Sequence, residues 1–371
     1  MPKAANDLRA QVGQLLIMGF DGVEMSARLR TTLETLQPAG VILFARNIQE
    51  PGQTWRLLRE CQRCVATPMF LCVDMEGGTV DRLKNIIAPV PSVADVARSG
   101  NREVFRRHGR VIGEECCALG FNTDFAPALD LALPPSKTVL TSRTASADPK
   151  DVVVYAREFL RGLKEAHVLG CGKHFPGLGE ANLDTHFKLP SIEKRWPRLW
   201  EEDLYPYRAL HRQLPFVMVA HAAYPAVTKD STPASISRKW ISDVLRKKIG
   251  YRGLIVSDDL EMGGVQAAAT VGDAAVETVK AGADIFLACH KEEVVWETYE
   301  AVFKAAEKDR RFARQVADAA RHVLLKKRAP ELKRHALEPT PANINKLRRE
   351  IWELGEQARL AAVAKDARVG A

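Results

Sequence analysis

An aspartate and a histidine, Asp184 and His186, stand two positions apart within the loop-like stretch 173–190. In an extended segment, residues i and i+2 point to the same side, so the carboxylate can lie against the imidazole. Such a pair orients a histidine and stabilises its protonated form, which suits acid–base catalysis. A polar surface loop can also contain an Asp-x-His by chance, so this pair indicates chemistry only together with other residues of the chain.

Asp258 is a second candidate for chemistry, because it ends a strongly apolar run. A carboxylate there can be a metal ligand, a cap for the next helix or a nucleophile. A metal site needs further ligands. Asp258, its neighbour Asp259 and the pair in the loop could supply them, but the chain has no H-x-x-x-H or D-x-D ligand motif. We therefore expect neither a metal nor another cofactor.

The same pattern, a charged or imidazole side chain after an apolar run, recurs along the chain. It is found at Arg46, Asp74, Glu76, Asp130, Lys173, His174, His221 and Asp259. Polar residues at strand ends partly reflect contact with water, but this many exceed what solvation requires. The pattern indicates a functional rim.

The apolar runs alternate with amphipathic stretches of helical pattern. The runs are residues 14–20, 40–44, 70–74, 123–126, 170–174, 216–220, 254–258 and 284–288. The helical stretches are 27–36, 53–64, 102–119, 149–166, 198–212, 236–248, 273–281 and 292–309. Strands that are buried on both sides and alternate with helices imply a parallel sheet. Eight such units in about 300 residues predict an α/β fold, a (β/α)8 barrel of the TIM type.

A barrel places its chemistry at the carboxyl ends of the strands, which is where the charged rim falls. The alternative fold is a doubly wound open sheet. No Gly-rich dinucleotide fingerprint follows the first run, and Gly77-Gly78 lacks the required spacing. The barrel is therefore favoured.

The chain is predicted to divide into a catalytic barrel, residues 1–328, and a C-terminal helical tail, residues 329–371. Within 343–364 apolar residues recur at helical spacing, at Ile344, Leu347, Ile351, Leu354, Ala358 and Ala361. This amphipathic helix is expected to pack on the barrel; binding a partner is the less favoured alternative.

Composition indicates a soluble globular protein of 371 residues, 46% hydrophobic and 27% charged. The N-terminus has no apolar core for a signal peptide, and no segment is apolar enough for a membrane span, so we expect a cytoplasmic protein. We also expect a monomer. The seven cysteines lack framework spacing and predict no disulfide scaffold. Of the net charge of +8, a net of +5 belongs to residues 326–371, which argues against a nucleic-acid-binding face.

Several separated segments resemble the signature of glycoside hydrolase family 3, in its single-domain β-N-acetylglucosaminidase branch. The main one is Lys-His-Phe-Pro-Gly-Leu-Gly at 173–179, continued by Asp184-Thr185-His186 and Leu189-Pro190. The others are Ile-Leu-Phe-Ala-Arg-Asn at 42–47, Val-Asp-Met-Glu-Gly-Gly at 73–78, Asp-Phe-Ala-Pro-Ala-Leu-Asp at 124–130, Ser-Arg at 142–143 and Ile-Val-Ser-Asp-Asp-Leu at 255–260. They stand in family order and cover roughly residues 10–325.

The resemblance implies a role for each site residue. Asp258 is the nucleophile of a retaining, two-step mechanism, and His186, oriented by Asp184, is the acid/base. The implied sugar ligands are Asp74, Arg143, Lys173, His174 and His221. The resemblance also implies a small carbohydrate substrate, terminal β-linked GlcNAc on cell-wall muropeptide fragments. Residues 352–361 look like the linker helix that leads into a second domain in larger relatives.

Three residues depart from the family pattern: Met75 for Gln, Thr79 for Arg and Leu178 for His. They bring the substrate detail into question but leave the nucleophile and acid/base in place. A histidine acid/base carries no negative charge, so phosphorolysis is one alternative. A β-glucosidase and a degenerate, non-catalytic sugar-binding barrel are the others.

Overall fold

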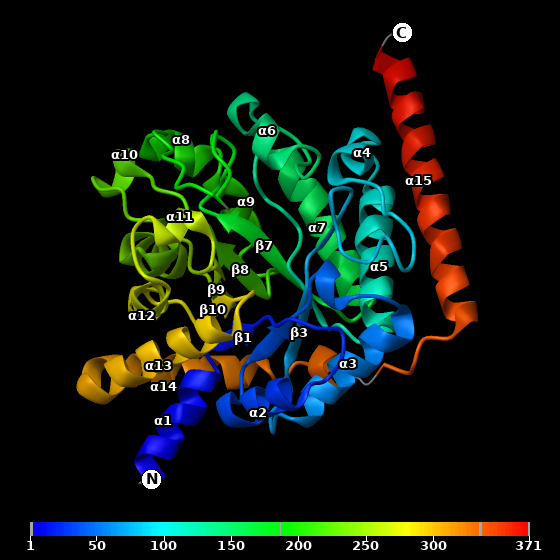
Figure 1. Ribbon diagram of the computed structural model, residues 1–371. Coiled ribbons are helices and arrows are strands. Elements are labelled where there is room, and N and C mark those ends of the chain that lie inside the picture. Colours follow the sequence, from blue (N-terminus) through cyan, green and yellow to red (C-terminus); the bar gives the residue numbers. More distant parts are fainter. Residues whose placement is uncertain (1–2, 186, 334–335, 370–371) are drawn as a thin grey trace.

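Eight parallel strands close into a barrel at the centre of the molecule (Figure 1). The computed structural model describes residues 3–185, 187–333 and 336–369. The order around the barrel is β1-β10-β9-β8-β7-β6-β3-β2. The strands are β1 Leu16–Met18, β2 Gly40–Ile42, β3 Phe70–Val73, β6 Thr123–Asp124, β7 Leu169–Phe175, β8 Phe216–Val219, β9 Leu254–Asp259 and β10 Ile285–Ala288. Each overlaps one of the apolar runs, and the predicted (β/α)8 fold is confirmed.

Side chains fill the barrel interior beneath the rim. Phe70 and Phe216 meet edge to face there, with 5.0 Å between ring centroids. Val323 and Leu332, which follow the last strand in sequence, belong to the same buried cluster. A second, larger cluster lies between the strands and the helices that surround them. The cavity at the rim therefore has a solid floor.

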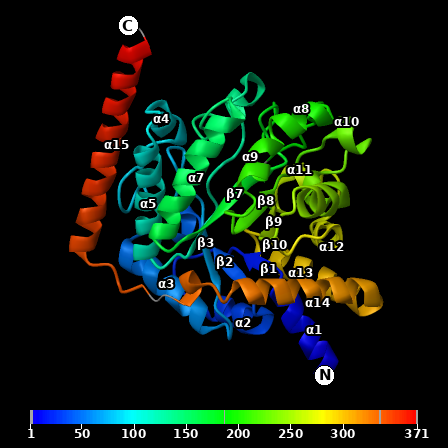
Figure 2. The same ribbon diagram turned by 180° about the vertical axis from the view of Figure 1, so that it is seen from behind.

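Helices cover the outside of the barrel (Figures 1 and 2). Their bounds are α1 Lys3–Gly13, α2 Ala27–Leu36, α3 Pro51–Arg63, α4 Val93–Arg98, α5 Arg102–Ala118, α6 Lys137–Leu140, α7 Pro149–Glu165, α8 Trp196–Glu201, α9 Leu204–Leu210, α10 Pro225–Thr228, η4 Lys239–Lys248, α11 Gly263–Gln266, α12 Val271–Ala281, α13 Glu292–Lys308, α14 Arg310–Lys326 and α15 Pro341–Val369. Short polar side chains cap several of them; Ser26, for example, accepts the Leu29 N–H at 3.0 Å. None of the helices in the described ranges is both long and apolar enough to cross a membrane.

The helices differ from the sequence pattern in two ways. The predicted helix 198–212 is divided into α8 and α9, because the chain leaves helical geometry at Glu202. The carboxylates of Glu202 and Asp203 both pair with the buried ammonium of Lys194, at 2.9 and 2.6 Å. A buried cation needs such partners, so this ion cluster interrupts the helix. The second difference is that several helices lie outside the predicted stretches: α1, α4, α6, α10, α11 and α14.

A small hairpin stands on the rim after β3. Its strands, β4 Met75–Gly77 and β5 Val80–Asp81, pair antiparallel and lie outside the barrel sheet. Gly77 and Gly78 turn the chain with positive φ angles of 83° and 61°. A Cβ on Gly77 would lie 2.2 Å from the Pro91 carbonyl oxygen, so only glycine fits there. The hairpin fixes Asp74 and Glu76 on either side of its start.

The C-terminal helix α15 packs along α4 and α5 on the outside of the barrel (Figures 1 and 2). Its buried face contains Ile344, Leu347, Ile351, Leu354 and Ala358, as the helical spacing predicted. These residues belong to the same hydrophobic cluster as the barrel helices. The division of the chain into a barrel and a tail at residues 328 and 329 stays a prediction.

Two carboxyl groups meet where α15 packs on α5. Burial, together with the hydrogen bond to Glu350, raises the pKa of Glu114 to about 7. Arg110 lies 3.9 Å from Glu114, and Lys346 lies 3.5 Å from Glu350. Both cations are partly exposed and only partly offset the repulsion between the two carboxylates.

We expect Glu114→Gln to stabilise the fold at alkaline pH. A carboxyl whose pKa is raised on folding destabilises the native state progressively as pH rises from about 4.5 through about 7. The variant should therefore gain about 1 kcal/mol above pH 7, a value reduced by solvent screening of this half-exposed group, and nothing below pH 4.5. Urea unfolding at both pH values measures the difference. Glu34→Gln, on the exposed side of α2, is the control; equal behaviour of the two variants would contradict the prediction.

Candidate active site

A cavity of about 150 Å³ opens at the carboxyl ends of the strands. By the same measure one water needs about 15 Å³, so the cavity has room for about ten waters, the size of one sugar ring. Among the sequence-predicted site residues, Asp74, Arg143, Lys173, His174, Asp184 and Asp258 line it. They come from β3, the loop after α6, β7 and the loop that follows it, and β9. The structure thus brings together side chains that are up to 184 positions apart in sequence, Asp74 to Asp258.

Lys173 is the centre of a buried charge network on the cavity floor. Its ammonium lies 2.8 Å from Asp74 Oδ1 and 2.7 Å from Glu76 Oε1. Burial alone would lower the pKa of Lys173, but Asp74 and Glu76 outweigh it and raise that pKa. Burial likewise favours neutral carboxyls, yet Lys173 and Arg143 hold the pKa values of Asp74 and Glu76 below their usual range. All these groups therefore remain charged at neutral pH.

Arg143 completes this network. Its Nε and Nη2 donate to the two oxygens of Glu76, each at 2.8 Å, in a bidentate pair. Burial tends to lower the pKa of Arg143, but Glu76 raises it overall. The side chain of Glu76 has no exposed surface, so its charge is matched by neighbouring side chains and not by water.

His174 is fixed in one tautomer by partners on both sides. Its Nδ1 lies 2.6 Å from Asp130 Oδ2, and its Nε2 lies 3.3 Å from Arg143 Nη2. A guanidinium can only donate, so Nε2 accepts and Nδ1 carries the hydrogen that is donated to Asp130. Asp130 also accepts the Leu178 N–H at 2.7 Å, which fixes the start of the loop after β7.

Asp258 stands on the other side of the cavity, near the end of β9. Its side chain is half-buried, and its Oδ1 accepts the backbone N–H of Asp259 at 2.9 Å. Asp259 is buried; its Oδ1 accepts the N–H groups of Glu261 and Cys289, at 3.1 and 3.2 Å. The nucleophile candidate is therefore held by a turn that is tied to the neighbouring strand end.

The loop after β7 reaches across the cavity to the β9 side. The Thr185 carbonyl accepts the Gly264 N–H at 3.0 Å, and both Asp184 and Thr185 line the cavity with Asp258. Near the base of the loop, Lys194 pairs with Glu180 at 3.3 Å as well as with the carboxylates between α8 and α9. His186 lies outside the described residues, so its predicted place against Asp184 stays a prediction.

His221 is placed differently from the sequence expectation. The ring is fully buried, with Nδ1 2.7 Å from Ser235 Oγ and Nε2 2.8 Å from the Asp259 carbonyl oxygen. Burial lowers its pKa and favours the neutral form. Both ring nitrogens are occupied beneath the rim, so the structure does not bring His221 to the sugar cavity. We assign it to holding the Asp259 turn instead.

Other lining residues were missed by sequence reasoning. Phe44, Arg82 and His290 line the cavity beside Asp258 and Asp74. The Arg82 Nε is buried without a hydrogen-bond partner among the described residues, and its guanidinium lies 5.8 Å from the Phe44 ring centre. A signal for Arg82 was available: a cation eight residues after Asp74, beyond the paired glycines. Glu76 and Asp130 were noted on the rim but given no role.

The three departures from the family pattern occupy different places. Met75 is buried under the hairpin, where its Sδ lies 3.3 Å from the Arg82 backbone nitrogen. Thr79 is exposed at the hairpin turn. Of the three residues, Leu178 alone lines the cavity.

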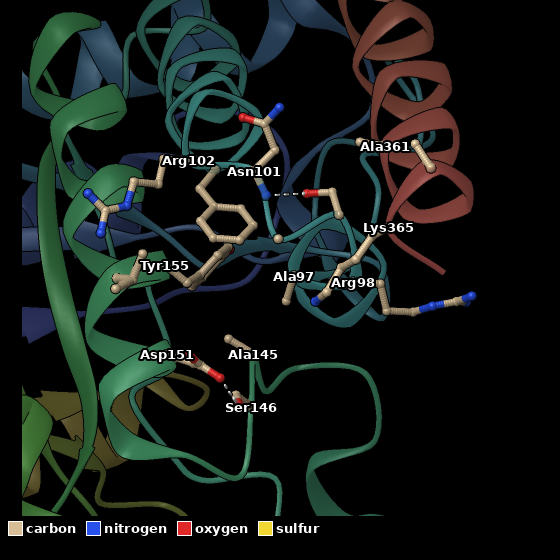
Figure 3. A pocket seen from close by; sticks show the side chains of 15 residues that line it. Ala97, Arg98, Asn101, Arg102, Ala145, Ser146, Asp151, Tyr155, Ala361 and Lys365 are labelled. Atoms are coloured by element: carbon tan, nitrogen blue, oxygen red, sulfur yellow. Dashed lines mark hydrogen bonds between the residues drawn. The ribbon is translucent and has the colours of Figure 1, made fainter. Parts of the chain in front are cut away.

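A larger hollow, of about 1080 Å³, lies on the side of the molecule between the α4–α5 turn, α7 and the end of α15 (Figure 3). Arg98, Arg102 and Lys365 border it, and its carboxylate Asp151 accepts a hydrogen bond from Ser146 at 3.2 Å. It lies away from the strand ends, and the described site residues predicted from the sequence are all elsewhere. We assign no chemistry to it.

No group of three or more His, Cys, Asp or Glu in residues 3–185, 187–333 and 336–369 is arranged to hold a metal ion. The expectation of a cofactor-free enzyme stays a prediction.

Comparisons with known proteins give a consistent result. The family model described as "Glycosyl hydrolase family 3 N terminal domain" matches residues 7–325. A β-hexosaminidase of Pseudomonas aeruginosa is 37% identical over 279 residues, which are 74% of this chain and 82% of that protein. One from Idiomarina loihiensis is 33% identical over 74% of this chain and 83% of its own length.

Solved structures agree. A glycoside hydrolase family 3 β-N-acetylglucosaminidase from Paenibacillus sp. aligns with a TM-score of 0.85 and 31% identity, over 94% of this chain and 68% of that chain. NagZ from Neisseria gonorrhoeae, in complex with N-trifluoroacetyl-D-glucosamine, aligns with a TM-score of 0.77 and 26% identity, over 93% of this chain and 98% of that chain.

We expect Glu76→Gln to destabilise the fold by about 3 kcal/mol or more, because it leaves Lys173 and Arg143 buried with one matching charge too few. Glu277→Gln is the control, since it breaks an ion pair of the same 2.8 Å length whose side chains are about half exposed. The control should cost less than about 1 kcal/mol. Urea unfolding measures both, and equal losses would contradict the buried-network interpretation.

Proposed function

Because the chain belongs to glycoside hydrolase family 3, we propose that it is a retaining exo-β-N-acetylglucosaminidase. Membership of that family makes it a glycoside hydrolase. The observation that carries the finer proposal is the meeting of Asp258 with the loop that holds Asp184, over one small cavity. Beneath them lies a floor of charged side chains suited to sugar hydroxyls.

In the proposed first step, Asp258 attacks the anomeric carbon as the bond to the leaving oxygen breaks. His186 gives its proton to that oxygen, and a covalent glycosyl-enzyme forms. Asp258 Oδ1 is already held by the Asp259 N–H, so we assign the attack to Oδ2.

In the second step, His186 takes a proton from a water that attacks the anomeric carbon, and the sugar is released with its β configuration retained. Retaining enzymes ordinarily use two carboxylates about 5–5.5 Å apart, so a histidine acid/base departs from that rule. The ordinary histidine pKa of about 6.5 suits proton donation near neutral pH. We propose that Asp184 stabilises the imidazolium and that the loop moves on substrate binding.

The sugar ligands that we propose are Asp74, Arg143, Lys173 and His174, and we add Arg82. Lys173 and Asp74 offer a donor and an acceptor at one point of the floor. Arg82 lines the cavity with a buried Nε that lacks a hydrogen-bond partner among the described residues. A sugar lacking the matching hydroxyl would leave these charged groups unpaired, which strongly disfavours the wrong substrate.

The size of the cavity supports exo action, since it takes about one sugar ring and its floor is filled by the barrel core. The N-acetylglucosamine specificity rests on the names of the relatives, one of which binds an N-acylated glucosamine in its solved structure. By the same resemblance we propose muropeptide fragments as the natural substrate. We further propose a cytoplasmic monomer that needs no cofactor and binds neither nucleic acid nor membrane.

We expect Asp258→Ala to lower kcat for p-nitrophenyl β-N-acetylglucosaminide by at least about 10³-fold, because the covalent route is lost. Release of p-nitrophenol measures the rate. Asp318→Asn, which changes an exposed aspartate on α14, should keep the parent rate. A mechanism-based 5-fluoroglycosyl fluoride should label Asp258 in the parent protein. A rate within tenfold of the parent in Asp258→Ala would show that another group is the nucleophile.

Water, and not phosphate, is expected to be the acceptor. Added phosphate should change the rate less than about twofold and yield free GlcNAc, whereas a phosphorylase would release GlcNAc-1-phosphate. Faster turnover of β-glucosides than of β-GlcNAc glycosides would favour the β-glucosidase alternative. Calorimetric binding of GlcNAc without turnover of any glycoside would favour the non-catalytic one.

A further inference from the structure

His290 is a half-exposed histidine on the rim that the proposed mechanism does not use. It follows β10 by two residues and lines the same cavity as Asp258. Its ring stacks on Phe44, with 5.5 Å between ring centroids and 24° between ring planes. Any flat side chain could stack on Phe44 in this way. The contacts that require a histidine are those of its two ring nitrogens.

Each ring nitrogen has a charged partner from a different strand end. Nε2 lies 3.1 Å from Asp259 Oδ2, and Nδ1 lies 3.2 Å from Arg46 Nη1. A guanidinium only donates, so Nδ1 accepts and Nε2 carries the hydrogen that it donates to Asp259. The neutral imidazole thus bridges the end of β2 to the end of β9.

The bridge acts on the backbone that holds the nucleophile. The N–H of Asp259 donates to Asp258 Oδ1 at 2.9 Å. The Asp259 Oδ1 accepts from the N–H groups of Glu261 and Cys289, and its carbonyl oxygen contacts His221 and the Met262 N–H. His290 supplies the one side-chain donor that holds Asp259 Oδ2 among the described residues. It does so from the cavity side, whereas His221 holds the same residue from beneath.

We infer that His290 is a positioning residue, which orients the nucleophile Asp258 through Asp259 and whose protonation changes the reactivity of that nucleophile. The inference rests on the proposed function, because it assumes that Asp258 attacks the sugar. Charged groups face His290 from each side. Asp259 ends β9 and Glu261 follows it, while Arg46, itself 3.0 Å from Asp21, follows β2.

Protonation opposes the bridge. The hydrogen bond to Asp259 raises the pKa of His290 above its ordinary value, with burial and Arg46 acting in the opposite direction. In the protonated ring, Nδ1–H would face an Arg46 N–H, and the contact to Arg46 would be lost. The positive charge of the protonated ring would also lie in the cavity that Asp258 lines. It would stabilise the Asp258 carboxylate and so make Asp258 a weaker nucleophile. The reaction of Asp258 should therefore become faster as His290 loses its proton.

Two variants separate the hydrogen bonds from the titration. His290→Phe keeps a ring on Phe44 but removes both contacts. His290→Gln can donate to Asp259 and accept from Arg46, yet does not titrate. The substrate is 2,4-dinitrophenyl β-N-acetylglucosaminide, whose leaving group needs no proton, so kcat/KM reports the attack by Asp258 without the acid function of His186.

We expect His290→Phe to lose about tenfold or more in kcat/KM for this substrate, and His290→Gln to keep a kcat/KM within about threefold of the parent at pH 8. The parent kcat/KM should rise with pH through an ionisation above the ordinary histidine value, and this rise should be missing in His290→Gln. Thermal unfolding checks that each variant is folded.

The inference is overturned if His290→Phe keeps the parent kcat/KM, if His290→Gln loses as much as His290→Phe, or if the parent and His290→Gln share one pH profile of kcat/KM. A parent protein that turns over no β-GlcNAc glycoside, or that is not labelled at Asp258, would instead refute the proposed function on which the inference rests.

Discussion

The buried ammonium of Lys173 is the constraint on which the rim depends. A cation removed from water is tolerated only where opposite charges surround it closely. Asp74, directly after β3, and Glu76, in β4, contact the ammonium of Lys173, and Arg143 balances Glu76 from the loop after α6. The ends of three segments that are distant in sequence are therefore held at one point by electrostatics as much as by packing. We propose that the same charged groups form the hydrogen-bonding floor for a sugar.

The opposite side of the rim is organised by backbone contacts. The carboxylate of Asp259 accepts N–H groups from its own turn and from the residue after β10. The backbone N–H of Asp259 in turn donates to Asp258 and fixes its side chain. The loop with Asp184 rests against this side through Thr185 and Gly264. One half of the site is thus a fixed set of matched charges, while the other is a turn whose geometry depends on neighbouring strands.

Much of the fold follows from the sequence, because short apolar runs and amphipathic stretches alternate with the period of a barrel. The strands and most of the helices lie where those patterns predict them. The break between α8 and α9 was missed, because it depends on Lys194 meeting carboxylates that no local pattern connects to it. The hairpin after β3 was missed as well, although its paired glycines were visible.

The site was predictable in part for a similar reason. The site residues Asp74, Lys173, His174 and Asp258 could be predicted because each stands at the end of an apolar run, and a barrel places such residues on one rim. His221 follows the same rule but lies beneath the rim, because strand-end position does not show on which side of the sheet a ring is buried. The roles of three further residues follow only from their surroundings in the folded protein. Glu76 is a buried charge that Lys173 and Arg143 match. Arg82 has a buried Nε without a hydrogen-bond partner among the described residues, and His290 bridges Arg46 and Asp259. Such relations exist in three dimensions and leave no local trace in the chain.

The filled barrel beneath the small cavity has a consequence for how a longer substrate would be processed. The released monosaccharide would sit at the closed end, with the remainder of the substrate between it and the solvent. The shortened substrate must therefore leave before the sugar can, and each cleavage ends in complete dissociation. Under the proposed exo function the enzyme would therefore be distributive: it would trim many ends once before it trimmed any end repeatedly, and its rate on polymers would follow the number of chain ends and not the polymer mass.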